Sequence, residues 1–243
     1  MSEPQALIRA PLAGDPGRAH AVREMFARIA PGYDRANRWM SLGIDRRWRR
    51  IALDALGAAA SGDVLDLCAG TLDFSLALAG SARRVVAVDF CAEMLEVGRR
   101  RLPPTAPVET VCADARELPL SPGVFDGAVI GFGIRNVPEP ERVLGELRRV
   151  LRPGGKLVIV DFFRPTTLLQ RLMAGSYNRL VLPVVGGALT GDAAAYRYLA
   201  DSMAAWCSRA EFEQLCVDQG FLAVSGQELF PPVASLVVAE RGV

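Results

Sequence analysis

The sequence has almost no histidine, since His20 is the one histidine among 243 residues. A Ser-His-Asp triad and a histidine-based metal site both depend on imidazole side chains, so we expect neither a hydrolase of that kind nor a bound metal. The five cysteines are odd in number and form no Cys-x-x-Cys pair, which is typical of reduced thiols packed in a core. These absences favour a reducing compartment, and we predict a cytoplasmic location.

A strong excess of one charge and a long apolar run are also missing. The 28 basic residues nearly balance the 27 acidic ones, so the net charge indicates no nucleic-acid partner. Residues 1–20 contain no continuous apolar segment and are interrupted by proline and glycine, which favours a mobile tail over a signal peptide. The apolar stretch 180–189 is about half the length of a membrane span, so we expect no transmembrane helix.

From residue 63 onward, short β-branched segments alternate with helical patterns. This order is typical of a parallel sheet with helices on both faces. The segments 221–230 and 235–241 predict a hairpin at the sheet edge, which completes a seven-stranded, mostly parallel sheet with an antiparallel C-terminal strand. The five expected parallel strands occupy residues 63–69, 84–90, 108–114, 125–133 and 155–163, and a helix over 139–151 should stop at the following Arg-Pro-Gly-Gly.

The expected organisation is one α/β domain over residues 21–243 after a tail of residues 1–20. Ser208, with Glu211 three residues later, predicts a capping box that opens the last helix. The parts of the domain are a helical lid (21–57), a cofactor-binding core (63–163), a substrate-side helical insertion (164–206) and a C-terminal helix with two strands (208–243).

Acidic residues follow the first three expected strands. Asp66 precedes the turn Gly70–Thr71, Asp89 ends the second strand, and Asp114 ends the third. In open α/β sheets a ligand binds beyond the carboxyl ends of the strands, where an acid accepts ribose hydroxyls. Three carboxylates would repel a pyrophosphate but suit a ribose, an adenine amino group and a positive charge. They favour S-adenosylmethionine as the cofactor, although each aspartate alone also fits a helix cap or an ordinary strand end.

Leu72 occupies the position of the middle glycine of a dinucleotide fingerprint. That glycine lets the backbone approach a pyrophosphate, and a ligand without phosphates makes no such demand. The substitution therefore counts against NAD more than against S-adenosylmethionine.

Five segments resemble one family, the menaquinone and ubiquinone biosynthesis C-methyltransferases, which are class I S-adenosylmethionine enzymes with a Rossmann-like fold. The glycine loop and the Arg-Pro-Gly-Gly turn are common to many methyltransferases, whereas residues 26–37 together with 131–137 are more specific. The five segments are VREMFARIAPGYDRANRWMSLGIDRRWRR, VLDLCAGTLDFSLALA, VVAVDFCAEMLEVGRRR, GFGIRNVPEPERVLGELRRVLRPGGKLVIVDFFRP and the Tyr-Arg-Tyr-Leu at 196–199.

The resemblance implies S-adenosylmethionine-dependent C-methylation of a prenylated quinol, either demethylmenaquinol or the corresponding benzoquinol, in respiratory quinone biosynthesis. Together with the strand-end aspartates, it gives two groups of site residues. Those expected to bind the cofactor are Asp66, Gly70, Thr71, Asp89, Phe90, Asp114, Ala115 and Gly131, and those expected around the reacting ring are Tyr33, Asp34, Asn37, Asp45, Arg135 and Asn136.

The proton acceptor for the quinol is left open among Asp34, Asp45 and a water held by Arg135 and Asn136. Arg135 either stabilises a developing phenolate or forms a salt bridge to a lid carboxylate such as Asp34. Residues 168–189 are expected to line a prenyl channel, with Arg171 and Arg179 at a lipid-facing rim, or else to pack as ordinary core. Weak peripheral membrane contact and a homodimer complete the expected partners.

Three positions depart from the family pattern. Leu72 is expected to narrow the space beside the methionine moiety, Asp45 replaces a histidine, and the C-terminal segment carries Pro231-Pro232 and Ser235–Val237 instead of the usual residues. They favour two alternatives: a methyltransferase of another small aromatic metabolite, and a non-catalytic protein of the same fold. An NAD oxidoreductase is a more distant alternative, because the loop lacks Gly-x-Gly-x-x-Gly.

Overall fold

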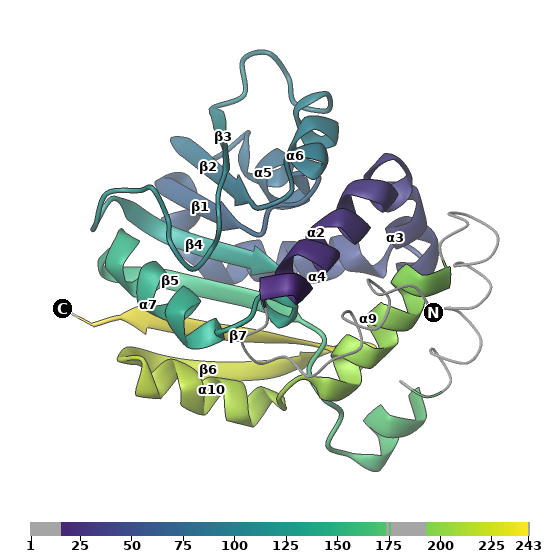
Figure 1. Ribbon diagram of the computed structural model, residues 1–243. Coiled ribbons are helices and arrows are strands. Elements are labelled where there is room, and N and C mark those ends of the chain that lie inside the picture. Colours follow the sequence, from purple (N-terminus) through teal and green to yellow (C-terminus); the bar gives the residue numbers. More distant parts are fainter. Residues whose placement is uncertain (1–15, 174, 176–192, 243) are drawn as a thin grey trace.

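The computed structural model describes residues 16–173, 175 and 193–242. Within these residues one sheet contains β1 (Asp63–Leu67), β2 (Arg84–Asp89), β3 (Val108–Cys112), β4 (Phe125–Gly131), β5 (Leu151–Asp161), β6 (Phe221–Leu229) and β7 (Ala234–Arg241). Their spatial order is β3-β2-β1-β4-β5-β7-β6 (Figure 1). The first five strands are parallel, and β7 runs antiparallel to both β5 and β6. The predicted seven-stranded mixed sheet and its edge hairpin are confirmed.

The start of β5 differs from the sequence-based prediction. The strand begins at Leu151, four residues before the expected start, although the preceding helix α7 (Pro140–Val150) stops where predicted. Leu151 is fully buried and pairs with Phe125, and a register shift follows before Gly127 pairs with Lys156. Burial of Leu151 in the core therefore draws the chain into the sheet before the Pro-Gly-Gly turn rather than after it.

Helices cover both faces of the sheet, as the alternating pattern predicts. On one face α7 and α10 (Arg209–Asp218) pack Leu147 and Phe212 into the core. On the other face α4 (Ile44–Leu56) and α5 (Asp73–Leu78) contribute Trp48 and Leu78, and α6 (Ala92–Arg99) lies beside β2. The predicted capping box of Ser208 opens α10.

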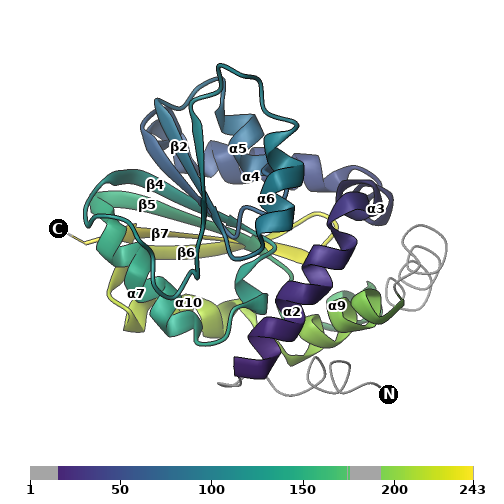
Figure 2. The same cartoon turned by 45° about the horizontal axis from the view of Figure 1, so that its top comes forward.

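The N-terminal helices lie beyond the carboxyl ends of the strands (Figure 2). They are α2 (Pro16–Ile29), the 3₁₀ turn η1 (Ala30–Gly32) and α3 (Tyr33–Ser41), after which α4 packs on the face of the sheet. Helix α2 begins at Pro16, so residues 16–20, which the sequence suggested as part of a tail, are helical. Proline is well tolerated in a first helical turn because its missing N–H is not needed there. Residues 1–15 lie outside the described part of the chain.

The expected insertion 164–206 contains a short helix over residues 168–173 and the helix α9 (Ala193–Ala205). Tyr198 of α9 packs against Val22 and Met25 of α2, and the two helices lie close together in both views (Figures 1 and 2). Most of the expected channel segment, including Arg179, lies outside the described residues. Among the residues that are described, no helix combines the length and apolar character needed to cross a bilayer.

Candidate active site

Two neighbouring cavities open at the carboxyl ends of the central strands. The smaller cavity has a volume of about 80 Å³ and the larger one about 320 Å³. Phe26 and Tyr33 from the lid, together with Phe132 after β4, line both of them. These three aromatic side chains therefore form the boundary between two adjoining binding spaces.

The smaller cavity contains most of the residues that the sequence assigned to the cofactor. They come from the ends of β2, β3 and β4 and from the loop after β1, so residues far apart in sequence meet at one edge of the sheet. Six of the eight predicted cofactor residues line this cavity: Gly70, Asp89, Phe90, Asp114, Ala115 and Gly131.

Asp89 is a nearly buried carboxylate at the end of β2. Its Oδ2 accepts a hydrogen bond from the backbone N–H of Gly70 at 2.8 Å, and its Oδ1 accepts one from Cys91 at 2.9 Å. Burial raises the pKa of Asp89, and these backbone hydrogen bonds act against that rise. Each carboxylate oxygen keeps a second lone pair, so Asp89 can accept two more donors from the cavity.

Asp114 has a different environment at the end of β3. Its side chain is about half exposed, and the guanidinium of Arg116 lies 2.7 Å from Oδ2. Hydrogen bonding to Arg116 lowers the pKa of Asp114. Asp114 is therefore ionised at neutral pH and remains an acceptor on the cavity wall.

Asp66 and Thr71, the other two predicted cofactor residues, are not among the described residues that line either cavity. Asp66 is buried beneath the loop and accepts hydrogen bonds from both the N–H and the hydroxyl of Ser75. Burial raises its pKa to about 7. The hydroxyl of Thr71 donates to Asp34 at 2.5 Å. Both side chains organise the loop after β1, and the cap interpretation of Asp66 matches this geometry.

Leu72 does not narrow either cavity. It adopts a left-handed backbone conformation with φ of 68°, and its side chain is fully buried against Leu95 of α6 and Ala87 of β2. Gly98 provides the space, because a Cβ placed there would lie 2.4 Å from Cγ of Leu72. The side chain that replaces the family's glycine is thus accommodated between the loop and α6.

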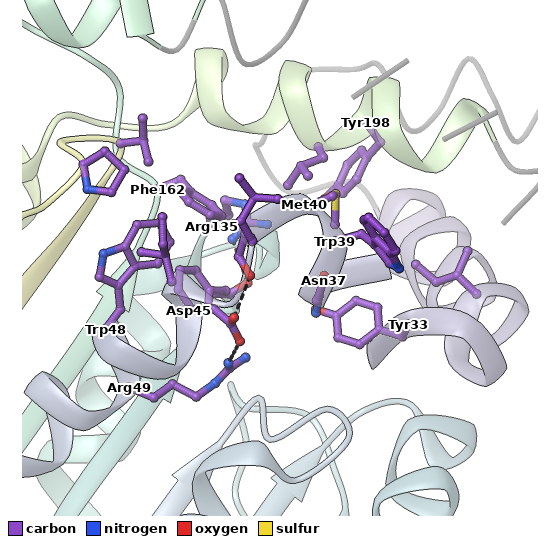
Figure 3. A pocket seen from close by; sticks show the side chains of 18 of the residues that line it. Tyr33, Asn37, Trp39, Met40, Asp45, Trp48, Arg49, Arg135, Phe162 and Tyr198 are labelled. Atoms are coloured by element: carbon purple, nitrogen blue, oxygen red, sulfur yellow. Dashed lines mark hydrogen bonds and ion pairs between the residues drawn. The ribbon is translucent and has the colours of Figure 1, made fainter. Parts of the chain in front are cut away.

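The larger cavity is mostly apolar and lies between the lid, α9 and the C-terminal loop. Among the predicted ring-binding residues, Tyr33, Asn37, Asp45 and Arg135 line it. Figure 3 shows Trp48 and Phe162 on one side of Arg135 and Trp39 with Tyr33 on the other. The combination of an aromatic wall and a few polar groups suits a flat ring that carries oxygen atoms.

Arg135 is nearly buried and is held by Asp161. Its Nη1 donates to Oδ1 of Asp161 at 2.5 Å and to the carbonyl of Phe132 at 2.7 Å, and the guanidinium lies 5.3 Å from the ring centroid of Phe162. Its buried Nε has no hydrogen-bond partner among the described residues. The alternative of a salt bridge from Arg135 to Asp34 is wrong, because the partner is Asp161.

The two lid carboxylates have separate partners. Asp34 accepts a bond from Thr71 and pairs with Arg101 at 2.8 Å, and it is not among the described residues lining either cavity. Asp45 lines the larger cavity, accepts the hydroxyl of Ser41 at 2.6 Å and pairs with Arg49. Both carboxylates border another hollow together with Asp73 and Arg101, but of the two only Asp45 also lines the larger cavity.

Asn136 lines the smaller cavity and accepts a hydrogen bond from the hydroxyl of Tyr198 at 3.0 Å. Burial raises the pKa of Tyr33, so this phenol stays protonated at neutral pH.

Sequence reasoning did not single out Asp161, Arg101 or Tyr198 as site residues. Asp161 lies inside the expected strand 155–163, two residues before its end, and Arg101 and Tyr198 lie in segments that carry the family resemblance without being assigned a role there.

Solved structures of similar fold include a phosphoethanolamine N-methyltransferase 2 from Haemonchus contortus in complex with S-adenosyl-L-methionine. It has a TM-score of 0.64 and 15% sequence identity, and the match covers 86% of this chain and 56% of that one. At this identity the likeness shows the fold alone. The sheet order, the N-terminal helices and this likeness define a class I methyltransferase fold.

Residues 16–240 match the ubiE/COQ5 methyltransferase family. A demethylmenaquinone methyltransferase from Clavibacter sepedonicus is 41% identical over 237 residues, which are 98% of this chain and 94% of that protein. A ubiquinone/menaquinone biosynthesis C-methyltransferase from Syntrophotalea carbinolica is 42% identical over 218 residues, covering 88% of this chain and 92% of that protein. The chain belongs to the ubiE/COQ5 methyltransferase family.

Proposed function

We propose that this methyltransferase uses S-adenosylmethionine to methylate a ring carbon of a prenylated quinol, demethylmenaquinol or the corresponding benzoquinol, in quinone biosynthesis. The observation that carries the proposal is the pair of adjoining cavities, one with acidic strand ends and one with an apolar wall. The names of the relatives support the same acceptor class. An acceptor ring in the larger cavity would meet the cofactor across the boundary formed by Phe26, Tyr33 and Phe132.

The smaller cavity fits S-adenosylmethionine better than a dinucleotide. Asp89 has free lone pairs for two ribose hydroxyls, and Asp114 adds a second negative charge, which disfavours a pyrophosphate. The guanidinium of Arg116, the cationic group on this wall, is already paired with Asp114 and Glu139. When bound, the cofactor supplies an electrophilic methyl group to a nucleophilic ring carbon.

Activation of the acceptor requires loss of a proton from a ring hydroxyl and stabilisation of the resulting negative charge. Asp45 is the carboxylate among the described residues that line the larger cavity, so we assign proton acceptance to Asp45 rather than to Asp34. The guanidinium cation of Arg135 stabilises the anionic ring oxygen. Protonated Tyr33 and the amide of Asn37 position the ring through hydrogen bonds.

A second acceptor class has support in two cavity residues. Asp45 replaces the family's histidine and Pro231 belongs to the altered C-terminal segment, and both line the larger cavity. These departures favour a different small aromatic acceptor.

We further propose a homodimer, a cytoplasmic location, and peripheral membrane contact through residues 168–189, of which Leu168, Leu169 and Leu172 are exposed.

Two measurements test the proposal in sequence. Calorimetry should detect micromolar binding of S-adenosylmethionine and S-adenosylhomocysteine, about −8 kcal/mol, and no binding of NAD. Incubation with short-chain demethylmenaquinol and with the benzoquinol analogue should then yield a product heavier by one methylene group. Binding of the sulfur nucleotides without turnover of either quinol would favour the second acceptor class, and absence of binding would contradict the cofactor assignment.

A further inference from the structure

The lid hairpin, residues 33–50, exposes two large apolar side chains at its tip. Trp39 is 59% exposed and Leu42 is 80% exposed. Arg35, Arg38 and Trp39 lie three and four residues apart in α3, which places their side chains on one face of the helix, and Leu42 is the residue that follows the end of α3. Ala36 is the buried residue of α3. Helix α3 and the residue after it therefore expose two cationic and two apolar side chains.

The start of α4 contacts α3, and Arg46 and Arg50 of α4 line one hollow with Arg38 of α3. Arg46, Arg47 and Arg50 are exposed, and their spacing again places them on one side of the helix. Arg46 and Arg47 lie in the first turn of α4, where the helix dipole disfavours positive charge. Their position gives no benefit to the isolated helix.

Neither these three arginines nor Arg35 and Arg38 form an ion pair with any described residue. Within the lid hairpin six arginines stand against two aspartates. Both aspartates are already engaged, Asp34 with Arg101 and Asp45 with Arg49. Exposed arginines elsewhere, such as Arg84, Arg100 and Arg142, do have acidic partners. Arg38, Arg46 and Arg50 line one hollow in which Asp34, Asp45 and Asp73 are already paired with Arg49 and Arg101. The arginines without an ion pair among the described residues therefore give the hairpin a net positive charge that an anionic partner would neutralise.

The tip of the hairpin also belongs to the larger cavity, since Trp39 and Leu42 both line it. Figure 3 shows Trp39 beside Tyr33 and Met40 at one side of this cavity. The exposed apolar groups are thus continuous with the cavity wall. A partner that contacts the tip would lie at the entrance of the cavity.

We propose that the outward face of the lid hairpin docks on an anionic lipid bilayer. Tryptophan is favoured at the membrane interface, and arginines beside an apolar tip attract anionic headgroups. Trp39 and Leu42 insert among the headgroups while Arg35, Arg38, Arg46, Arg47 and Arg50 neutralise them. If the acceptor is a prenylated quinol, which rests on the proposed function, its chain passes from the bilayer into the cavity without crossing water.

The sequence offers a built-in reporter for this contact. It contains three tryptophans, of which Trp48 and Trp206 are buried while Trp39 is exposed. The full-length protein is mixed with vesicles of phosphatidylcholine alone or of phosphatidylcholine with phosphatidylglycerol, some carrying brominated acyl chains. Flotation measures binding, and bromine quenching of tryptophan fluorescence measures insertion. Trp39→Phe identifies the quenched residue.

The charge part of the proposal is tested with R46Q/R47Q/R50Q and a matched triple variant, R84Q/R142Q/R148Q, which changes exposed arginines outside the hairpin. Each arginine near an anionic surface contributes about fivefold to partitioning. The hairpin variant should therefore partition roughly a hundredfold more weakly to anionic vesicles, and the matched variant should bind like the wild type. Binding of the wild type should fall at high salt.

The expected result is flotation with anionic vesicles and quenching that Trp39→Phe abolishes. Wild-type protein that stays in the soluble fraction, or that binds neutral vesicles equally well, overturns the proposal. So does equal binding by the hairpin variant. Methyl transfer to a water-soluble quinol without a prenyl chain, measured without vesicles, is unchanged in R46Q/R47Q/R50Q if only docking is lost. That assay separates failure of the docking surface from failure of the proposed reaction.

Discussion

Arg135 and Asp161 form an ion pair that is shielded from water on both sides, with side-chain exposures of 6% and 0%. Arg135 lies in η3 (Ile134–Asn136) after β4, and Asp161 ends the neighbouring strand β5. Asp161 holds Nη1 of the Arg135 guanidinium, and Arg135 also lines the larger cavity. A cation held in this way needs little reorganisation when negative charge develops on a bound ring.

Asp161→Asn should lower both stability and turnover. The substitution removes the countercharge of a buried cation, and breaking such a pair costs about 3 kcal/mol or more. Urea unfolding measures the stability loss. We also expect a fall in kcat with little change in the affinity for S-adenosylmethionine, because Asp161 acts through Arg135 in the larger cavity.

Glu109→Gln is the matched control, since it breaks the exposed Arg84–Glu109 pair. Exposed pairs contribute at most about 1 kcal/mol, so this variant should remain near wild-type stability. If Asp161→Asn loses no more stability than the control, the buried pair does not have the role given to it here. A loss of stability with unchanged kcat would limit Asp161 to a structural role.

The fold was largely predictable because its signals are local and repeated. Apolar segments of β-branched residues, such as the one before Asp89, predict buried parallel strands, and Ser208 with Glu211 marks a helix start by its own hydrogen bonds. The start of β5 was missed because burial of Leu151 against its neighbours, a tertiary effect, overrides the local turn signal. The start of α2 at Pro16 was missed because a proline at the first helical turn resembles a proline in a loop.

The site was predictable where side-chain position follows from strand order. Asp89 and Asp114 line the smaller cavity because they end adjacent parallel strands. Asp66 stands at an equivalent place in sequence but points beneath the loop to Ser75, a choice that depends on three-dimensional packing. The partners of Arg135 and Asp34 depend on contacts between distant segments, and sequence spacing gives no information about them.

Gly98→Ala should destabilise the protein through Leu72. The added Cβ would lie 2.4 Å from Cγ of Leu72 and 2.8 Å from the carbonyl carbon of Thr71, and overpacking of this kind costs about 1–3 kcal/mol. Leu72→Ala should rescue the variant only in part, because the contact with the Thr71 backbone remains. Gly145→Ala in α7 is the control, since a Cβ there meets nothing within 4 Å, and it should stabilise the helix by about 0.5–1 kcal/mol. Equal unfolding midpoints for both alanine variants would contradict this account.

Arg101→Gln should weaken cofactor binding by about tenfold, a loss close to the net value of one charge-assisted hydrogen bond. Arg101 joins the lid to the loop after β1: it contacts Asp34 at 2.8 Å, the carbonyl of Thr71 at 2.8 Å and Asp73 at 2.7 Å. Calorimetry with S-adenosylmethionine measures the change. Arg100→Gln is the control, because Arg100 pairs with Glu96 on its own helix. Equal affinities for the two variants would show that the lid contact does not support the cofactor loop.

The raised pKa of Asp66 predicts that stability falls as pH increases from about 4 to about 7. The folded state holds a proton on Asp66 up to about pH 7, whereas the unfolded chain releases it near the ordinary aspartate pKa of 3.8. The unfolded state therefore binds fewer protons in this window, so the free energy of unfolding decreases as pH rises. At about 1.4 kcal/mol per unit the total loss is on the order of 4 kcal/mol, complete above about pH 7.

Urea unfolding of the wild type and of Asp66→Asn across this window measures the difference. The amide introduced by this substitution cannot ionise, so the variant should lose much of the slope between about pH 4 and pH 7. The pKa of Asp89 is also raised by burial, which leaves part of the slope in place. The exposed Asp54→Asn serves as the control and should keep the wild-type profile. If the free energy of unfolding depends on pH in the same way for all three proteins, the pKa of Asp66 in the folded state is not raised by its burial, and this prediction is wrong.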